Sequence, residues 1–165
     1  MNEMTLSVLE RYKDNLPVPI IKIANELGIE VYETVDLKDK QSGLIKKEGD
    51  SYVIYVNALH PSTRKRFTIA HEIAHFLEHK DKIGDEYITN SKQPLKREDN
   101  PLLAGRENEM EIEANKIAAK LLMPEKKFIE IWNICDTIED VAERFDVSVS
   151  AAAIRGERLL RQTMI

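Results

Sequence analysis

The stretch from Arg66 to His79 constrains the fold of this chain more than any other feature. It contains the pattern His71-Glu72-Ile-Ala-His75 within a run of apolar residues at helical spacing. In an α-helix, residues four positions apart lie one above the other, so the imidazoles of His71 and His75 face the same point. Two nitrogen ligands at this spacing suit one zinc ion at distances of about 2.0–2.1 Å. The sequence therefore predicts a metal-binding helix.

Glu72 lies roughly 100° around the same helix from His71. A carboxylate at this position is near the metal but off the ligand line, where it can accept a proton from water. The alternative is a surface helix whose histidines are merely solvated. An apolar stripe beside the histidines disfavours this alternative, because it gives the helix a side that packs against a core. The stripe consists of Phe67, Ala70, Ile73, Ala74 and Leu77.

His79 continues the line of histidines by one more turn. It lies about 12 Å along the helix axis from His71, so the two cannot bind the same tetrahedral ion. We interpret His79 as a side chain that the helix dipole favours in the last turn. A contact with substrate near the site is the alternative.

A second helix, predicted from residue 107 to residue 122, supplies candidates for the third ligand that a catalytic zinc site needs. Glu111 and Asn115 are four residues apart and share one side of the helix. Glu111 can therefore bind the ion, while Asn115 forms a hydrogen bond to another ligand without binding the ion itself. Glu113 lies about 200° around this helix from Glu111, so both cannot reach one ion. Glu111 is favoured because it alone has the polar partner, and Glu113 stays a candidate. A solvated acidic face is the alternative for the whole helix.

The two motifs together resemble the ImmA/IrrE-type metallopeptidases. Arg66–His75 and Glu111–Pro124 carry the resemblance. It extends upstream to Pro19–Ile29, Ser42–Ile45 and Tyr52–Asn57, and it covers most of residues 17–125. The separation of His75 from Glu111 is long for the family, so residues 80–106 are interpreted as an insertion.

The resemblance implies a gluzincin, in which His71, His75 and Glu111 bind zinc and Glu72 acts as the catalytic base. It also implies a partner, because the family cleaves or otherwise inactivates helix-turn-helix repressors of mobile elements or stress responses. We therefore expect a zinc-dependent endopeptidase with one specific protein substrate. The alternative is a metal-binding regulator that binds a repressor or DNA without cutting. His60, His79 and Tyr87 are candidates for stabilising the oxyanion.

The predicted fold class is α+β. A small antiparallel or mixed sheet of about three strands should pack on the zinc-binding helix and on the second ligand helix, with further helices at the C-terminus. The strands are predicted at residues 29–35, 43–47 and 51–57, the last two joined as a hairpin across residues 48–50. One exposed edge of this sheet can bind a peptide as an added strand over the zinc.

Two parts are predicted along the chain. Residues 1–125 form the metallopeptidase domain, and within it residues 80–106 are a loop that either covers the cleft or has no role. Residues 126–165 form a helical extension, expected to pack on the same domain, whose helices meeting at residues 146–148 resemble a helix-turn-helix. Its arginines at positions 144, 155, 158 and 161 are offset by neighbouring acidic residues. DNA is therefore disfavoured as a partner.

Composition limits the remaining classes of function. With 165 residues, 42% of them hydrophobic, the chain can bury a core, and its net charge of −5 argues against broad binding of nucleic acids. The single cysteine, Cys135, excludes an internal disulfide and fits a reducing compartment. Neither a transmembrane span nor a signal-peptide core is recognisable. The expected location is the cytoplasm, without a membrane partner, and the oligomeric state stays open.

Overall fold

The computed structural model describes residues 1–37, 41–84 and 106–163. Its elements, in chain order, are α1 (Glu3–Tyr12), α2 (Ile20–Glu26), β1 (Ile29–Thr34), β2 (Gly43–Glu48), β3 (Ser51–Asn57), α3 (Ser62–His79), the 3-10 turn η1 (Lys80–Lys82), α4 (Arg106–Leu122), α5 (Glu125–Ile134), α6 (Ile138–Phe145) and α7 (Val149–Thr163). The predicted α+β fold class is confirmed. Most of the predicted insertion, residues 85–105, lies outside the described residues.

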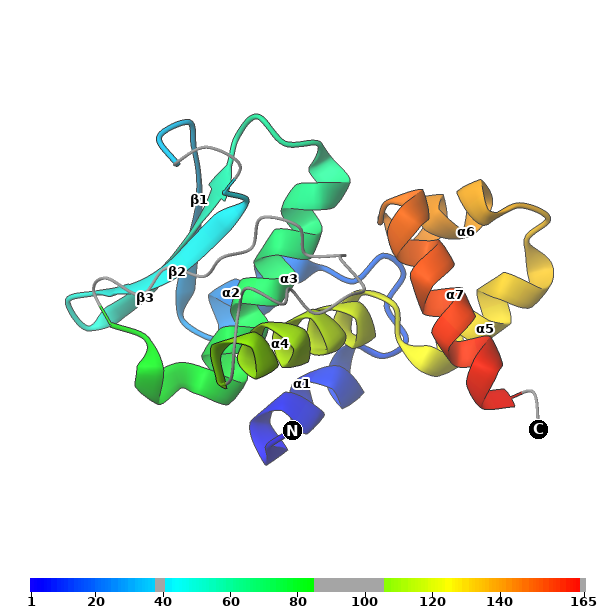
Figure 1. Cartoon of the computed structure of the whole chain (residues 1–165), viewed down its shortest axis with the longest axis horizontal. Coiled ribbons are helices and arrows are strands. Elements are labelled where there is room, and N and C mark those ends of the chain that lie inside the picture. Colours follow the sequence, from blue (N-terminus) through cyan, green and yellow to red (C-terminus); the bar gives the residue numbers. More distant parts are fainter. Residues whose placement is uncertain (38–40, 85–105, 164–165) are drawn as a thin grey trace.

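The strands form a mixed sheet in the order β1-β3-β2 (Figure 1). The central strand β3 pairs in parallel with β1 and antiparallel with β2. The predicted hairpin between β2 and β3 is present, and Gly49 makes its turn with a φ of +63°. Glycine adopts this left-handed conformation without the steric cost of a side chain.

Helix α3 lies at the centre of the molecule. Every residue from Phe67 to Leu77 is buried. A helix buried on all sides must be covered on all sides. The sheet, α2, α1 and α4 supply this cover, and α4 crosses α3 on the side away from the sheet (Figure 1). Pro61 precedes this helix as its N-cap.

The edge strand β2 lies directly against α3. A Cβ atom on Gly43 would stand 2.5 Å from Cγ2 of Thr68 and 2.7 Å from the carbonyl oxygen of Tyr55. Only glycine allows so close an approach of backbone to helix. Arg64 fixes the start of the strand from α3, because its guanidinium donates to Oγ of Ser42 at 3.1 Å.

The C-terminal helices α5, α6 and α7 lie together at one side of α3 and α4, the two helices that carry the candidate ligands (Figure 1). Two arginines, the half-buried Arg66 and the buried Arg155, connect them to the rest of the molecule. Arg66 of α3 donates to the carbonyl oxygen of Asp146, the left-handed residue that ends α6, and Arg155 of α7 donates to the carbonyl oxygen of Met123 after α4. Hydrophobic residues from both sides of the predicted boundary share one cluster. The packing of the described residues is thus continuous across this boundary, and the division after residue 125 stays a prediction.

Among the helices in the described ranges, none is both long enough and apolar enough to cross a membrane.

Candidate metal centre

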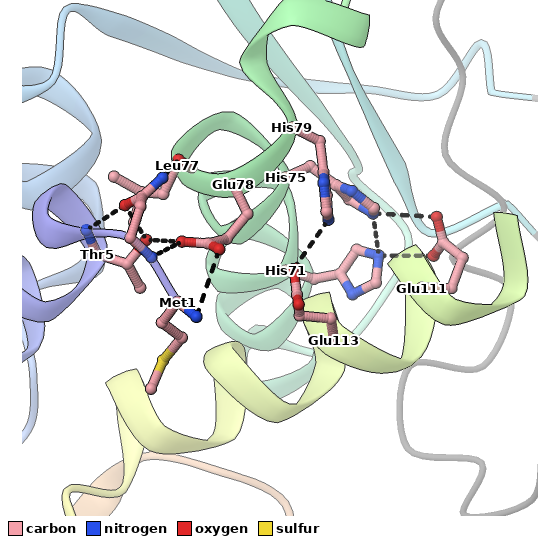
Figure 2. A network of polar contacts seen from close by, with 10 residues as sticks. Met1, Thr5, His71, His75, Leu77, Glu78, His79, Glu111 and Glu113 are labelled. Carbon is pink, nitrogen blue, oxygen red and sulfur yellow. Dashed lines mark hydrogen bonds and ion pairs between the residues drawn. The ribbon is translucent and has the colours of Figure 1, made fainter. Parts of the chain in front are cut away.

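The ligand helices bring three side chains to one point. His71 Nε2 lies 2.9 Å from Oε2 of Glu111, His75 Nε2 lies 3.0 Å from its Oε1, and the two Nε2 atoms are 3.1 Å apart (Figure 2). Ligand atoms at the corners of a zinc tetrahedron are about 3.3 Å from one another, given bonds of about 2.0–2.1 Å. The triangle therefore has nearly the dimensions that one ion requires.

The triangle lies inside the fold and is not a cluster on the surface. The residues His71 and His75 are fully buried, and the side chain of Glu111 is 18% exposed. Helix α3 provides both histidines from consecutive turns, and α4 brings the carboxylate across from the neighbouring helix. The donor set of two imidazoles and one carboxylate is that of a catalytic zinc site.

Asn115 orients one of the histidines. Its Oδ1 lies 2.8 Å from Nδ1 of His71. Because the amide oxygen can only accept, Nδ1 of His71 carries the proton, and its Nε2 is the atom that faces Glu111 and His75. Asn115, four residues after Glu111, thus provides the second hydrogen bond that a metal-binding histidine usually makes through its other ring nitrogen.

Electrostatics in the triangle favour a positive charge. Burial alone would lower the pKa of His71, but its hydrogen bond with Glu111 and the charges of Glu72 and Glu111 raise that pKa overall. Burial lowers the pKa of His75 to about 4, so this histidine is neutral near pH 7. The pKa of Glu111 is lowered: burial opposes its ionisation, but the contacts with both histidines outweigh burial. A divalent cation would satisfy this arrangement with more charge than one proton supplies.

Glu72 lies beside the ligands and is fully buried. It follows His71 by one position on α3, about 100° around the helix from that ligand. Its charge acts on the His71 ring. A buried carboxylate next to a metal, but outside its ligand set, is the position from which a general base acts.

The outer edge of β2 can be placed along α3 from the contacts of the sheet with this helix. The backbone N–H of Lys47 donates to the carbonyl oxygen of Gly84 at 3.2 Å, so Lys47 faces away from β3. Outward-facing residues alternate along an antiparallel strand, so the backbone of Ile45 also faces outward. Gly43 lies against Thr68 of α3, and Tyr52, which pairs with Lys47, packs on Phe76 of the same helix. Ile45 is midway between Gly43 and Lys47, and Glu72 is midway between Thr68 and Phe76. Ile45 is therefore level with Glu72 along the helix.

The acidic candidates on α4 have separate positions. The structure brings Glu111 between the two histidines, whereas Glu113 lies 3.3 Å from Nε2 of His79 (Figure 2). The roles of His71, Glu72, His75 and Glu111 remain predictions that this geometry fits.

The candidates for the oxyanion donor are widely separated. The ring of His79 is 5.5 Å from that of His75, centre to centre. His60 precedes the first turn of α3, and nine residues at about 1.5 Å each separate the start of that helix from His71. His60 is therefore remote from the ligands, and Tyr87 lies outside the described residues.

Sequence reasoning missed the residues that fix the ligand helices from outside, chiefly Glu78 and Thr5. The side chain of Thr5, near the start of the chain, donates a hydrogen bond to Glu78 at the end of α3. Neither residue belongs to a recognisable motif. The only sequence signal was Asn2, a residue type that commonly caps a helix.

A family model described as the IrrE N-terminal-like domain of the Peptidase_M78 group matches residues 24–157. The chain belongs to this family. The resemblance stated from the sequence is thereby confirmed. Peptidases of the M78 family depend on a metal ion, and the grouping of His71, His75 and Glu111 offers a place for one. The family supports a metallopeptidase-like function.

One solved structure with a similar fold is a Mycobacterium tuberculosis transcriptional regulator. It shares 15% identity with this M78 chain, and the TM-score is 0.61. The match covers 94% of this chain and 47% of the regulator, so the chain spans about half the regulator's length. At this identity, the likeness shows the fold alone. A comparison with curated proteins found no match.

Proposed function

We propose that this protein is a zinc-dependent endopeptidase that cleaves one specific protein. The observation that carries the proposal is the buried triangle of His71, His75 and Glu111 with the carboxylate of Glu72 at its side. A merely structural zinc site has four protein ligands, whereas a catalytic site keeps one position open. Three ligand side chains are found here among the described residues.

When bound, zinc would supply a Lewis acid that acidifies water and polarises the scissile carbonyl group. Glu72 accepts the proton of the attacking water and then delivers it to the leaving amine. Asn115 keeps Nε2 of His71 directed at the ligand triangle. Burial of these groups strengthens their electrostatic effect, because little water screens them.

The edge of β2 indicates how a substrate would bind. A polypeptide in extended conformation can pair with the outward-facing backbone of Ile45, which lies level with Glu72. Pairing through the main chain places a peptide bond beside the base without demanding a particular side chain. Substrates should therefore be cleaved within segments that can become extended.

The proposed substrate is a helix-turn-helix repressor of a mobile element or a stress response. This part of the proposal rests on the family resemblance and not on a contact in the structure. DNA itself is not the proposed partner, because Arg155 of the helix-turn-helix-like pair is only 8% exposed and bonds to Met123.

Co-expression with the repressor encoded nearest to this protein tests the proposal. Intact-mass spectrometry should show one discrete repressor fragment pair with the wild type, and none with Glu72→Gln. Glu143→Gln, which removes an exposed carboxylate of α6, is the matched control and should cleave like the wild type. We expect the loss in Glu72→Gln to be at least about 100-fold, the usual contribution of a general base.

Two results would contradict the peptidase. One is cleavage that persists in Glu72→Gln, since the water would then be activated by another group. The other is an uncut repressor that co-purifies with both the wild type and Glu72→Gln. The latter result would identify the alternative function, a metal-binding regulator that binds the repressor without cutting it.

A further inference from the structure

Helix α1 lies outside the stretch that matches the family, which begins at residue 24. It nevertheless packs on both ligand helices, α3 and α4 (Figure 1). Thr5 is fully buried, and Tyr12 at the other end of the helix is 6% exposed. Tyr12 also donates a hydrogen bond to Glu26 at the end of α2. This helix is therefore held at both ends against the part of the molecule that carries the metal centre.

The start of α1 is bonded to the end of α3. The backbone N–H of Asn2 donates to Oε2 of Glu78 at 2.8 Å, and the hydroxyl of Thr5 donates to the same carboxylate. In return, Nδ2 of Asn2 donates to the carbonyl oxygen of Leu77 at 2.6 Å. Figure 2 shows this network beside the ligand triangle. We refer to Asn2, Thr5, Leu77 and Glu78 as the N-terminal latch.

The latch acts on the part of α3 that is least secured by the helix itself. The last four carbonyl groups of a helix have no partner within it, and Leu77 is one of these residues because α3 ends at His79. Asn2 supplies the missing donor. The positive end of α1 also faces the negative end of α3, an arrangement that the helix dipoles favour.

Glu78 is well suited to this contact. Burial opposes its ionisation, but the hydrogen bonds from Thr5 and from the Asn2 backbone outweigh burial and lower its pKa. The carboxylate is thus charged near neutral pH, and hydrogen bonds to a charged acceptor are roughly twice as strong as neutral ones.

The metal centre lies one turn away from the latch. His75 precedes Glu78 by three residues, and its ring contacts that of His79, the last residue of the helix. Loss of helical geometry in this turn would rotate His75 away from His71 and Glu111. A ligand displaced in this way weakens metal binding even when all three ligand residues are present.

We propose that the N-terminal latch positions His75 for zinc and thereby sets the metal affinity of the site. Asn2, Thr5 and Glu78 are positioning residues in this proposal, because none of them touches the metal or the substrate. The inference rests on the zinc site of the proposed function. It adds to that function an element outside the family match on which metal binding depends.

Competition with a chromophoric chelator at one fixed pH measures the zinc affinity of the full-length variants. Thr5→Val keeps the shape of the side chain and removes the hydroxyl donor, and Glu78→Gln removes the charge. We expect each to bind zinc about tenfold more weakly, the lower limit for indirect support of a metal ligand. Thr5→Ser keeps the donor and should bind like the wild type.

Gly156→Ala separates positioning from general destabilisation. A Cβ on Gly156 would stand 2.6 Å from the ring of Trp132, between α7 and α5, far along the chain from the latch. This variant should be less stable to denaturant and should retain the zinc affinity of the wild type. Amide hydrogen exchange of the zinc-free proteins should become faster at residues 74–79 in Thr5→Val and unchanged there in Gly156→Ala.

The possible outcomes distinguish failure of the latch from failure of the zinc site itself. If Thr5→Val and Glu78→Gln bind zinc like the wild type, the latch is only an attachment for α1 and the inference is overturned. If Thr5→Ser is as weak as Thr5→Val, the hydroxyl is not what acts, and the inference is again overturned. If the wild type binds no zinc, the metal site itself fails, and the proposed function fails with it.

Discussion

At the scale of single residues, the site depends on which side of a helix each group occupies. Glu111 and Glu113 have the same chemistry and differ by two positions, which is about 200° on a helix. Only Glu111 lies between the histidines, and Glu113 instead contacts His79. Asn115 shares the side of Glu111 and bonds to His71. One turn of α4 thus supplies a candidate ligand and the support for another.

Replacement of the two acidic residues should have opposite consequences. Glu111→Gln removes a charged ligand, so zinc should fall well below one ion per chain after purification with excess metal. Glu113→Gln leaves the triangle intact and should retain stoichiometric zinc. Elemental analysis of both proteins makes this comparison. Full zinc in Glu111→Gln together with loss in Glu113→Gln would assign the ligands the other way round.

At the scale of elements, the close contact of β2 with α3 sets which part of the sheet edge is level with Glu72. Gly43 permits this contact because Thr68 and the Tyr55 carbonyl occupy the space of a side chain. Neither periodicity nor propensity reveals such a contact. The sequence Ser42-Gly43 is informative only once the helix opposite is known.

Gly43→Ala should therefore destabilise the fold by about 1–3 kcal/mol, the usual cost of overpacking. Urea denaturation measures this loss. Thr68→Ser removes the Cγ2 atom that would collide, so it should recover part of the stability in the double variant. Gly84→Ala is the matched control, because no atom of the described residues lies within 4 Å of its added Cβ. Equal stability of Gly43→Ala and Gly84→Ala would mean that β2 can move aside without cost.

At the scale of the whole molecule, two arginines join the C-terminal helices to both ligand helices. Arg66 extends from α3 to the end of α6, where it also lies 3.3 Å from the carboxylate of Asp146. Arg155 connects α7 to the end of α4. Arg155, one of the arginines of the helix-turn-helix-like pair, is therefore used within the fold. The helix-turn-helix-like pair thus contributes to holding the ligand helices together.

Charge reversal at two arginines of α7 should separate folding from surface contacts. Arg155→Glu buries a negative charge beside the Met123 carbonyl and should cost about 3–5 kcal/mol of stability. Arg158 is exposed, and Arg158→Glu should change stability by no more than about 0.5 kcal/mol. Thermal or urea unfolding distinguishes the two. If both variants unfold like the wild type, Arg155 does not support the contact between α7 and α4.

The sequence by itself determined the features that local geometry controls. Helical periodicity placed His71, Glu72 and His75 on neighbouring positions of one helix, and turn residues such as Gly49 marked the hairpin. The approximate bounds of the strands and of the ligand helices followed from the same signals. These interactions span a few residues, so the local pattern is sufficient to predict them.

Only the tertiary structure decided how these elements meet. His71 and Glu111 are separated by 40 positions, and Thr5 and Glu78 by 73. The sheet order β1-β3-β2, the choice of Glu111 over Glu113 in the triangle and the N-terminal latch all depend on how distant surfaces pack. Packing follows from the shape and burial of many side chains at once, and no periodicity along the chain records it.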